Sequence, residues 1–411
     1  MSPAPFELPL KASEAATLAD ITFQLLENRR LQEDLRHRLA SRAAGLNLTS
    51  IRPYWGSLQQ DPVHASSFYL AIDALSGPTL QPMLLRMALA SSPASGLFPK
   101  AMLIGRMRPG GGREVVVNAA NFGPADTAAI DTFATQVDRA FLPRPQGSAP
   151  SITVVSTDPE RELSVAFEGF RLAQRSAGLN LASIAAPPGL ALRTLPAAVW
   201  SAIRAGWRDG YNLEAEPLAL ERIDLDDAVH EQAAFTRFRA ALTENAGEPP
   251  ADALDGVLEE FGRRFTIATS VCQFEPVELQ ALHARYAASL AAAEKLFDSV
   301  RRHRIAAGYG RAFDFEIVMP PADWRAVLFC LHWLKTRGRP ATLVAVPLPT
   351  IEEATQLGAV ARHFGVTLSF DAAAVSQLKH PSRWAGGRWN CRLEGEITAE
   401  RIHALATALR T

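Results

Sequence analysis

Apolar segments rich in β-branched residues alternate along most of the chain with longer segments in which apolar residues recur at helical spacing. In the helix that this spacing predicts over 158–178, Leu163, Phe167 and Phe170 share one stripe. Strands separated by helices of about ten or more residues need crossover connections, which indicates a parallel sheet. Eight such strands favour a closed, TIM-like (β/α)8 barrel. The predicted strands are 115–121, 151–157, 181–186, 265–271, 313–319, 342–348, 366–372 and 388–395.

The part of the chain before these strands has a different pattern. Residues 13–44 carry an amphipathic helix, whereas residues 45–110 mix short apolar segments with loops rich in Pro, Gly and Ser. We therefore predict an N-terminal α/β extension, residues 1–110, packed on a barrel domain formed by residues 111–411.

A doubly wound open sheet is the alternative architecture. It would be strengthened by a glycine-rich turn after the first strand, but residues 118–124 offer one glycine, Gly123, and no dinucleotide fingerprint. The segments 222–243 and 251–264 are predicted to be additional helices, inserted in the barrel.

The amino-acid composition argues against nucleic acid or an anionic membrane as a binding partner. The chain has 42 basic and 43 acidic residues, so it lacks the one-sided charge that nucleic acid or an anionic membrane would attract. The N-terminal residues do not resemble a signal peptide and no apolar segment is long enough to span a membrane, which favours a cytoplasmic location. Cys272, Cys330 and Cys391 lie far apart and are predicted to be small buried hydrophobes rather than zinc ligands or a disulfide.

Catalytic side chains of a barrel come from the carboxyl ends of its strands, so polar residues within or just after the apolar segments are the candidates. Glu316 is the strongest candidate, because Phe315 and Ile317 flank it in a strand that should be buried on both faces. A buried carboxylate must be paired, protonated or bound to a ligand. An ion pair with Arg311 or Arg388 is the structural alternative. The candidates are Asn118, Asn121, Asp158, Gln273, Glu275, Asp314, Glu316 and Asp371.

Six segments, spread over roughly residues 110–400, share one resemblance: REVVVNAANF at 113–122, VDRAFLP at 137–143, RAGWRDGYNLEAEPL at 204–218, AAEKLFDSVRRHR at 292–304, AFDFEIVM at 312–319, and the stretch from VARHFG to RWNCRLEG at 360–395. Together they resemble the tagaturonate/fructuronate epimerase family. The resemblance implies a divalent-metal-dependent isomerase that inverts one hydroxyl-bearing carbon of a ketouronic acid by retro-aldol cleavage and re-addition.

The same resemblance implies roles for individual residues. Glu316 matches the glutamate of the family's Asp-Phe-Glu strand, and Asp371 stands where the family has a histidine, so both are expected to be catalytic and both could hold the metal. A barrel of this type is also expected to form a homo-oligomer in some cases. The residues expected to bind the substrate are Arg208, Asp209, Asp314, Arg388 and Trp389.

The chain departs from the family pattern where imidazoles are expected: at 271–275, at 371–376 and at Glu216-Pro217. Losing these nitrogen ligands would leave an oxygen-only set that favours a weakly held hard cation. Two hypotheses follow. The chain is either an altered epimerase-like enzyme, or a catalytically inactive paralogue that binds a sugar acid or a protein partner through the same barrel mouth.

Overall fold

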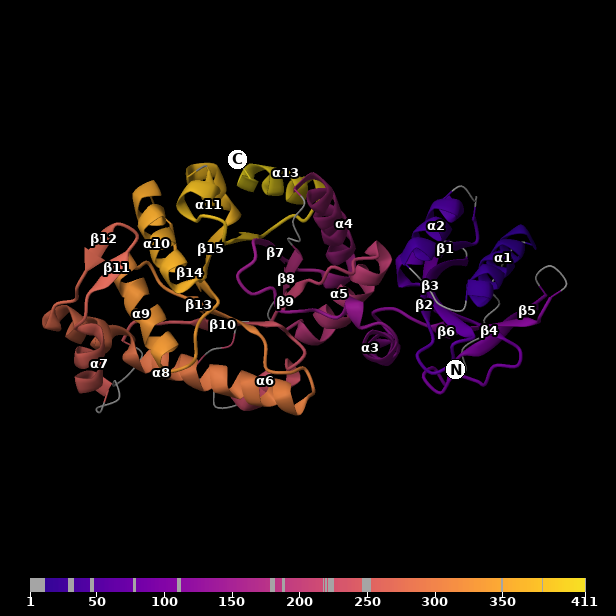
Figure 1. Ribbon diagram of the computed structural model, residues 1–411, viewed down its shortest axis with the longest axis horizontal. Helices are drawn as coiled ribbons and strands as arrows, with labels where there is room; N and C mark the ends of the chain where they lie inside the picture. Colours follow the sequence, from indigo (N-terminus) through magenta and orange to yellow (C-terminus); the bar gives the residue numbers. More distant parts are fainter. Residues whose placement is uncertain are drawn as a thin grey trace. The chain divides into compact units, whose positions relative to one another are not determined.

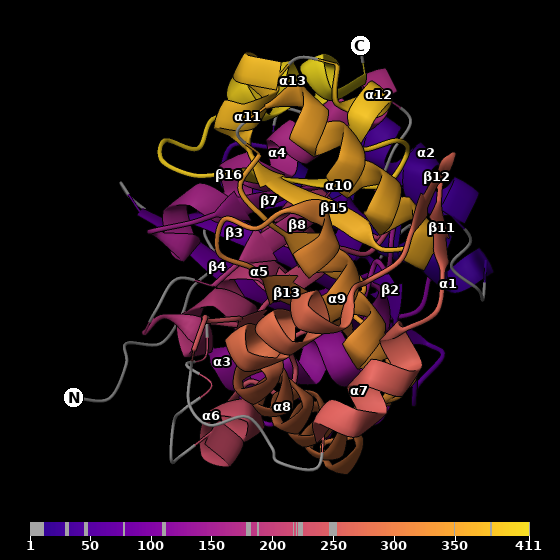
Figure 2. The ribbon, with the colours of Figure 1, turned by 90° about the vertical axis from the view of Figure 1, so that its left-hand side faces the viewer.

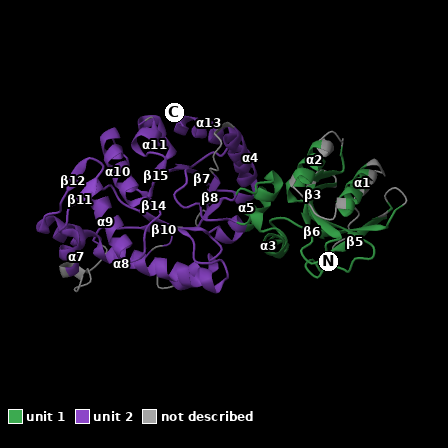
Figure 3. Ribbon diagram, in the orientation of Figure 1, with its two compact units in different colours: residues 1–142, 196–209 green, residues 143–195, 210–411 purple. Residues whose placement is uncertain are grey.

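The structure is a computed structural model whose chain divides into two compact units, one made of residues 1–142 and 196–209 and the other of residues 143–195 and 210–411 (Figure 3). Each unit is described separately below. The residues that the structure describes are 12–28, 33–44, 48–76, 79–108, 112–177, 182–186, 189–216, 218, 220, 225–245, 253–348, 350–378 and 380–410.

The N-terminal unit is built on an antiparallel sheet in the order β1-β3-β4-β6-β5, with β2 paired to β3. Period-two alternation in β3 places Phe68 and Ile72 in one core with Leu18 and Leu25 of the first helix. The predicted helix at 13–44 is therefore two helices that bury their apolar stripes in this core. The elements are α1 (Ala12–Asn28), α2 (Glu33–Ala44), β1 (Ile51–Pro53), β2 (Gln59–Gln60), β3 (Ser67–Ser76), β4 (Thr79–Leu89), β5 (Met102–Met107), β6 (Val115–Asn121) and α3 (Thr127–Thr132).

The segment 115–121, predicted as the first barrel strand, is β6 of this sheet, and that assignment was wrong. Its neighbours are β4 and β5, both antiparallel to it, so its alternation reflects a sheet covered by helices α1 and α2 rather than a barrel wall. The division between the compact units accordingly falls after Leu142 rather than at residue 110.

The second unit is a TIM-like (β/α)8 barrel, as predicted (Figure 1, Figure 2). Its strands follow one another around the barrel in chain order, every paired neighbour is parallel, and the last strand closes on the first. The strands are β7 (Ser151–Val155), β8 (Ala182–Ala185), β9 (Asn212–Glu214), β10 (Arg237–Ala241), β13 (Asp314–Val318), β14 (Leu343–Ala345), β15 (Thr367–Asp371) and β16 (Trp389–Leu393).

Two barrel strands differ from the prediction. The segment 265–271 is not in the barrel but forms a small antiparallel hairpin, β11 (Phe265–Ile267) and β12 (Ser270–Cys272). The barrel uses β9 instead, which is only three residues long, and β10, which lies inside the predicted helix 222–243. Among the described residues of that segment, 225–243, α6 (Leu225–Glu231) is the helix, and the alternating charges of β10 belong to a strand whose charged face points into the barrel.

The helices after Leu142 agree better with the sequence prediction. Leu163, Phe167 and Phe170 of α4 are fully buried, which confirms the stripe predicted for them. Gly365 ends α10 in the left-handed conformation, with φ of 70°, as expected for a glycine after a helix. The helices are α4 (Pro159–Ala177), α5 (Ala191–Ala205), α6, α7 (Ala253–Phe261), α8 (Pro276–Ala306), α9 (Trp324–Thr336), α10 (Ile351–Phe364), α11 (Ala372–Leu378), α12 (Pro381–Trp384) and α13 (Ala399–Arg410).

Two further expectations can be checked against the fold. Cys272, Cys330 and Cys391 are buried free cysteines, which confirms the prediction that they are small buried side chains. Within the described residues, no helix combines the length and apolar character needed to cross a membrane.

Candidate functional site

The interior of the barrel is polar, although the interior of such barrels is usually filled by bulky apolar side chains. Alternate residues of β10 point inward and outward: Phe238 and Ala240 are buried against the surrounding helices, while Arg237 and Arg239 meet side chains from other strands. Partners in the strand register share the inward face, and its polar residues include Ser151, Thr153, Ser183, Asn212, Glu214, Arg237, Arg239, Asp314, Glu316, Ser369, Asp371, Asn390 and Arg392.

The first layer, at the amino ends of the strands, is centred on Asp314. Its carboxylate accepts hydrogen bonds from the backbone N–H of Gln146, at 3.0 Å, and of Gly147, at 3.0 Å, and from the side-chain amide of Asn212. Burial raises the pKa of Asp314, against the opposing effects of Arg237 and these hydrogen bonds. Asp314 thus lies at the end of the barrel opposite to the mouth, where it ties the chain before β7 to β13. Its expected role in substrate binding stays a prediction.

The middle layer is a set of hydrogen bonds around the uncharged side chain of Asn390 of β16. The side-chain oxygen of Asn390 accepts from the hydroxyls of Ser151 and Thr153, both at 2.7 Å, while its amide donates to Ser369 at 2.7 Å. Arg237 donates to the hydroxyl of Thr153 at 3.0 Å. This layer fixes the positions of β7, β10, β15 and β16 beneath the charged groups described next.

The charged layer is nearest the carboxyl ends of the strands and holds two carboxylates among three guanidinium groups. Glu214 accepts two hydrogen bonds from one guanidinium nitrogen of Arg392, at 2.9 and 2.8 Å, and lies 3.7 Å from Arg239 and 3.8 Å from Arg237. Glu316 forms an ion pair with Arg239 at 2.9 Å. We call these five residues, from β9, β10, β13 and β16, the charged layer.

Electrostatic interactions in the charged layer keep Glu214 and Arg392 ionised. Burial alone would raise the pKa of Glu214, but Arg392, Arg239 and Arg237 together hold it below its ordinary value. Burial acts to lower the pKa of Arg392, yet the neighbouring carboxylates Glu214 and Glu316 raise it overall. The carboxylates are sealed off, with side-chain exposures of 1% for Glu214 and 0% for Glu316, whereas Arg239 and Arg392 keep 14% and 8%. The accessible side of this layer is therefore cationic.

Asp371 supplies the exposed acid of the mouth. It is the last residue of β15, on the same face as Ser369, and its register partner on the neighbouring strand is Arg392. Of the two residues expected to be catalytic, Asp371 is thus open to a ligand and Glu316 lies beneath Arg239. Both roles stay predictions.

The remaining expected substrate-binding residues lie elsewhere. Arg208 and Asp209 belong to the N-terminal unit, where Arg208 pairs with the buried Asp138 and stacks over the ring of Phe141 at 5.2 Å. Arg388 precedes β16 and donates to the carbonyl of Gly365 at 2.8 Å, and Trp389 is the buried first residue of that strand. Arg388 and Trp389 are consequently at the amino end of their strand, away from the mouth of the barrel, and the expected role of these four residues in substrate binding stays a prediction.

Sequence analysis missed Glu214, Arg237, Arg239 and Arg392. A signal was present: in RFRAA at 237–241 the charged residues alternate with positions that are apolar in the structure. This is the pattern of a strand with one charged face, but charged side chains usually indicate solvent, which is why the sequence predicts an additional helix over 222–243. The ion pair considered for Glu316 does exist, but its partner is Arg239 rather than Arg311 or Arg388.

The donor groups at the mouth fit a divalent metal poorly. Within the described part of the chain, no three His, Cys, Asp or Glu side chains are grouped so that they could hold a metal ion. Glu214 and Glu316 already neutralise guanidinium groups, so a cation would have to displace an arginine from a buried carboxylate and then lie beside the displaced charge.

Comparison with known proteins identifies the fold. No protein-family model matches the chain, and no curated protein matches its sequence. Solved structures of the fructuronate-tagaturonate epimerase UxaE from Cohnella laeviribosi do match it. The native form has a TM-score of 0.60 at 16% identity, covering 87% of this chain and 75% of that one. A glycerol complex has a TM-score of 0.61 at 15% identity, covering 88% and 75%. The chain therefore has the fold of this epimerase, as the resemblance in its sequence implied.

Proposed function

We propose that this protein is an epimerase-like isomerase that binds a ketouronic acid at the mouth of its barrel. One observation carries the proposal: the accessible side of the charged layer consists of Arg239 and Arg392, while the carboxylates that neutralise them are hidden. Guanidinium groups bind carboxylates in well-defined geometry and keep their charge at any physiological pH. The shared fold with a fructuronate-tagaturonate epimerase supports the same class of ligand.

The chemistry that these residues could perform is a retro-aldol epimerisation. Asp371 takes the proton from the hydroxyl group on the carbon to be inverted, the adjacent carbon–carbon bond breaks, and the products are an aldehyde and an enediolate. The enediolate adds to the other face of the aldehyde, and the proton returns from Asp371 to the new hydroxyl. No oxidant or reductant is consumed.

Arginine provides the positive charge that this reaction needs. Arg392, beside Asp371 in the strand register, would bind the sugar carboxylate, and Arg239 would stabilise the enediolate. Glu316 would act through Arg239, whose guanidinium it holds at 2.9 Å, as a positioning residue. The sequence resemblance implies a divalent metal for this charge stabilisation, but the side chains here do not fit one, and no step is assigned to it.

A second candidate is a catalytically inactive sugar-acid-binding protein with the same site. The observation that favours it is that Glu214 and Glu316 are buried and each is ion-paired with arginine, which makes the exposed Asp371 the one candidate base among the five charged-layer residues and Asp371. Both candidates share the ligand and differ in turnover.

Binding is tested first, by the thermal stability of the full chain in the presence of fructuronate or tagaturonate, with the neutral sugars fructose and tagatose for comparison. A ligand that binds the native state raises the melting temperature. We expect the uronates to do so and the neutral sugars not to. Equal shifts for charged and neutral sugars, or no shift for either uronate, would contradict the proposal.

Turnover is then followed by proton NMR of the interconversion of the two uronates. Asp371→Asn is expected to abolish turnover and keep binding, because it removes the exposed base but neither arginine. Glu316→Gln should raise KM and lower kcat together by disordering Arg239. Glu168→Gln, at an exposed position of α4, is the matched control and should leave both unchanged. Binding without turnover in the unmodified protein would select the inactive candidate.

A further inference from the structure

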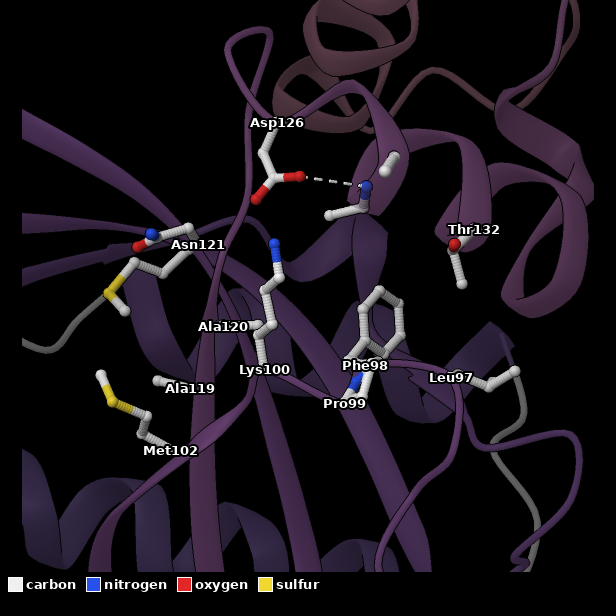
Figure 4. Close-up of a pocket in the computed structure, with 13 residues that line it drawn as sticks. Leu97, Phe98, Pro99, Lys100, Met102, Ala119, Ala120, Asn121, Asp126 and Thr132 are labelled. Carbon is white, nitrogen blue, oxygen red and sulfur yellow. Dashed lines mark hydrogen bonds between the residues drawn. The ribbon is translucent and has the colours of Figure 1, made fainter. Parts of the chain in front are cut away.

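The N-terminal unit contains a cavity of about 310 Å³ that is separate from the barrel (Figure 4). It lies where β6 ends and β5 begins, next to α3, and all its lining residues fall between Met83 and Thr132. Much of the lining is apolar, including Met83, Phe98 and Ala120. Its volume is at the lower end of the range for small-molecule sites, which is roughly 300–1,000 Å³.

The walls of this cavity are held in place by contacts outside it. Phe98 packs edge-on against Tyr69, with ring centroids 5.3 Å apart, and the hydroxyl of Tyr69 bonds to Asp61 at 2.9 Å and to Ser95 at 2.6 Å. These bonds fix the loop that carries Phe98. Because the loop is anchored, the cavity is preformed and a ligand need not pay for ordering it.

The opposite wall is fixed by the connection from β6 to α3. Phe122 is buried in edge contact with Phe133, at 5.4 Å. Gly123 follows with φ of 148°, and a Cβ there would approach the side chain of Pro82 to 2.9 Å, so the close passage requires glycine. This passage places Asn121 and Asp126 at one end of the cavity.

Three polar side chains converge on that end. Figure 4 shows Lys100 extending from the apolar part of the cavity toward the end where Asn121 and Asp126 lie. Asp126 uses one oxygen, Oδ1, to accept from the backbone N–H of Ala129 at 3.3 Å, while Oδ2 has no hydrogen bond to the residues described. Lys100 likewise makes no ion pair with any carboxylate in the described part of the chain.

We propose that this cavity binds a free α-amino acid with an apolar side chain. A ligand carrying only a carboxylate would meet repulsion from Asp126, and one carrying only an ammonium group would meet repulsion from Lys100. A zwitterion satisfies both: its ammonium group faces Oδ2 of Asp126, its carboxylate faces Lys100 and the amide of Asn121, and its side chain packs against Phe98 and Met83. The proposal does not depend on the function of the barrel.

Isothermal titration calorimetry of the full chain with phenylalanine and methionine tests the proposal. Two analogues each remove one charge: 3-phenylpropionate lacks the ammonium group and phenethylamine lacks the carboxylate. We expect both amino acids to bind and each analogue to bind at least about tenfold more weakly, the loss of one charge-assisted hydrogen bond. If neither amino acid binds at millimolar concentration, or either analogue binds as tightly as phenylalanine, the proposal is wrong.

Two variants locate the site. Asp126→Asn removes the charge but keeps the helix cap, because asparagine caps as well as aspartate does, so the fold is preserved. Lys100→Met keeps the length of the side chain. Each should weaken phenylalanine binding at least about tenfold. Lys295→Met, at an exposed position of α8 in the barrel unit, is the control and should leave it unchanged. Phenylalanine binding that survives both cavity variants would overturn the assignment.

Discussion

Replacing Glu214 by glutamine tests whether the charged layer exists as described. Glu214 is 1% exposed and is the carboxylate that all three guanidinium groups share, at 2.8 Å from Arg392 and 3.7 and 3.8 Å from Arg239 and Arg237. Glutamine has nearly the same shape but leaves three buried cations with Glu316 as the remaining carboxylate of the layer. Removing one partner of a buried ion pair costs about 3–5 kcal/mol, and we expect a loss of that size at neutral pH.

The pH dependence of this loss follows from the lowered pKa of Glu214. A carboxylate with a lower pKa in the folded state stabilises the fold above its ordinary pKa of 4.5, and this contribution is lost as the pH falls through the folded-state pKa. The unmodified protein should therefore lose stability on acidification, while the variant has already lost this contribution. The difference between them must shrink as the pH falls below 4.5.

Urea unfolding followed by circular dichroism measures the difference, and peptide-level hydrogen exchange assigns it to β9, β10 and β16. Separate assignment is needed because the two compact units need not unfold together. Glu168→Gln, at an exposed position of α4, is the control and should change stability by less than about 0.5 kcal/mol. A Glu214→Gln variant as stable as this control at neutral pH, or a difference that grows on acidification, would refute the charged layer.

Three further predictions follow from the described contacts. A chelator should leave the uronate-induced thermal shift unchanged, and mass spectrometry should find no stoichiometric metal, because the carboxylates of the charged layer are bound to arginine. Stoichiometric metal would contradict this assignment. Burial, assisted by Arg263, lowers the pKa of His332 from 6.5 to about 4, so an NMR titration should give a midpoint near 4 and stability should fall by roughly 3 kcal/mol as the pH drops from 6.5 to 4. A midpoint near 6.5 would show that His332 is solvated. Gly358→Ala should destabilise the barrel by about 3 kcal/mol in urea unfolding, since its Cβ would lie 1.8 Å from the carbonyl oxygen of Trp384. Unchanged stability would mean that α10 and α12 are not in this contact.

The barrel could be predicted because its helices and most of its strands have sequence patterns that depend on local burial. Strands such as 151–155 and 314–318 are apolar or β-branched on their outward face, and the helices after them carry clear stripes. What local pattern cannot show is which sheet a strand joins. The segment 115–121 is as strand-like as any barrel strand, but its pairing is decided by β4 and β5, which the sequence does not place beside it.

The site was harder to predict than the fold, because its residues violate the burial preferences on which prediction relies. Arg237 and Arg239 are charged residues of a strand, yet the side chain of Arg237 is 1% exposed and that of Arg239 only 14% exposed. Their burial is possible only because Glu214 and Glu316 arrive from β9 and β13, which are distant in sequence. The local sequence around Arg237 and Arg239 does not contain the carboxylates that neutralise them.

Glu316 shows how far sequence reasoning about a site can go. Its position in an apolar strand required a partner or a ligand, and the structure supplies a partner, Arg239. Arg239, rather than Glu316, is therefore the member of this pair that could contact a substrate. A carboxylate with 0% exposure beneath a guanidinium with 14% exposure cannot meet a substrate first, whereas the guanidinium can. Burying a charged pair costs free energy that an apolar pair would not, so a barrel that keeps three arginines in its charged layer needs a reason beyond stability. An anionic ligand at that mouth provides one.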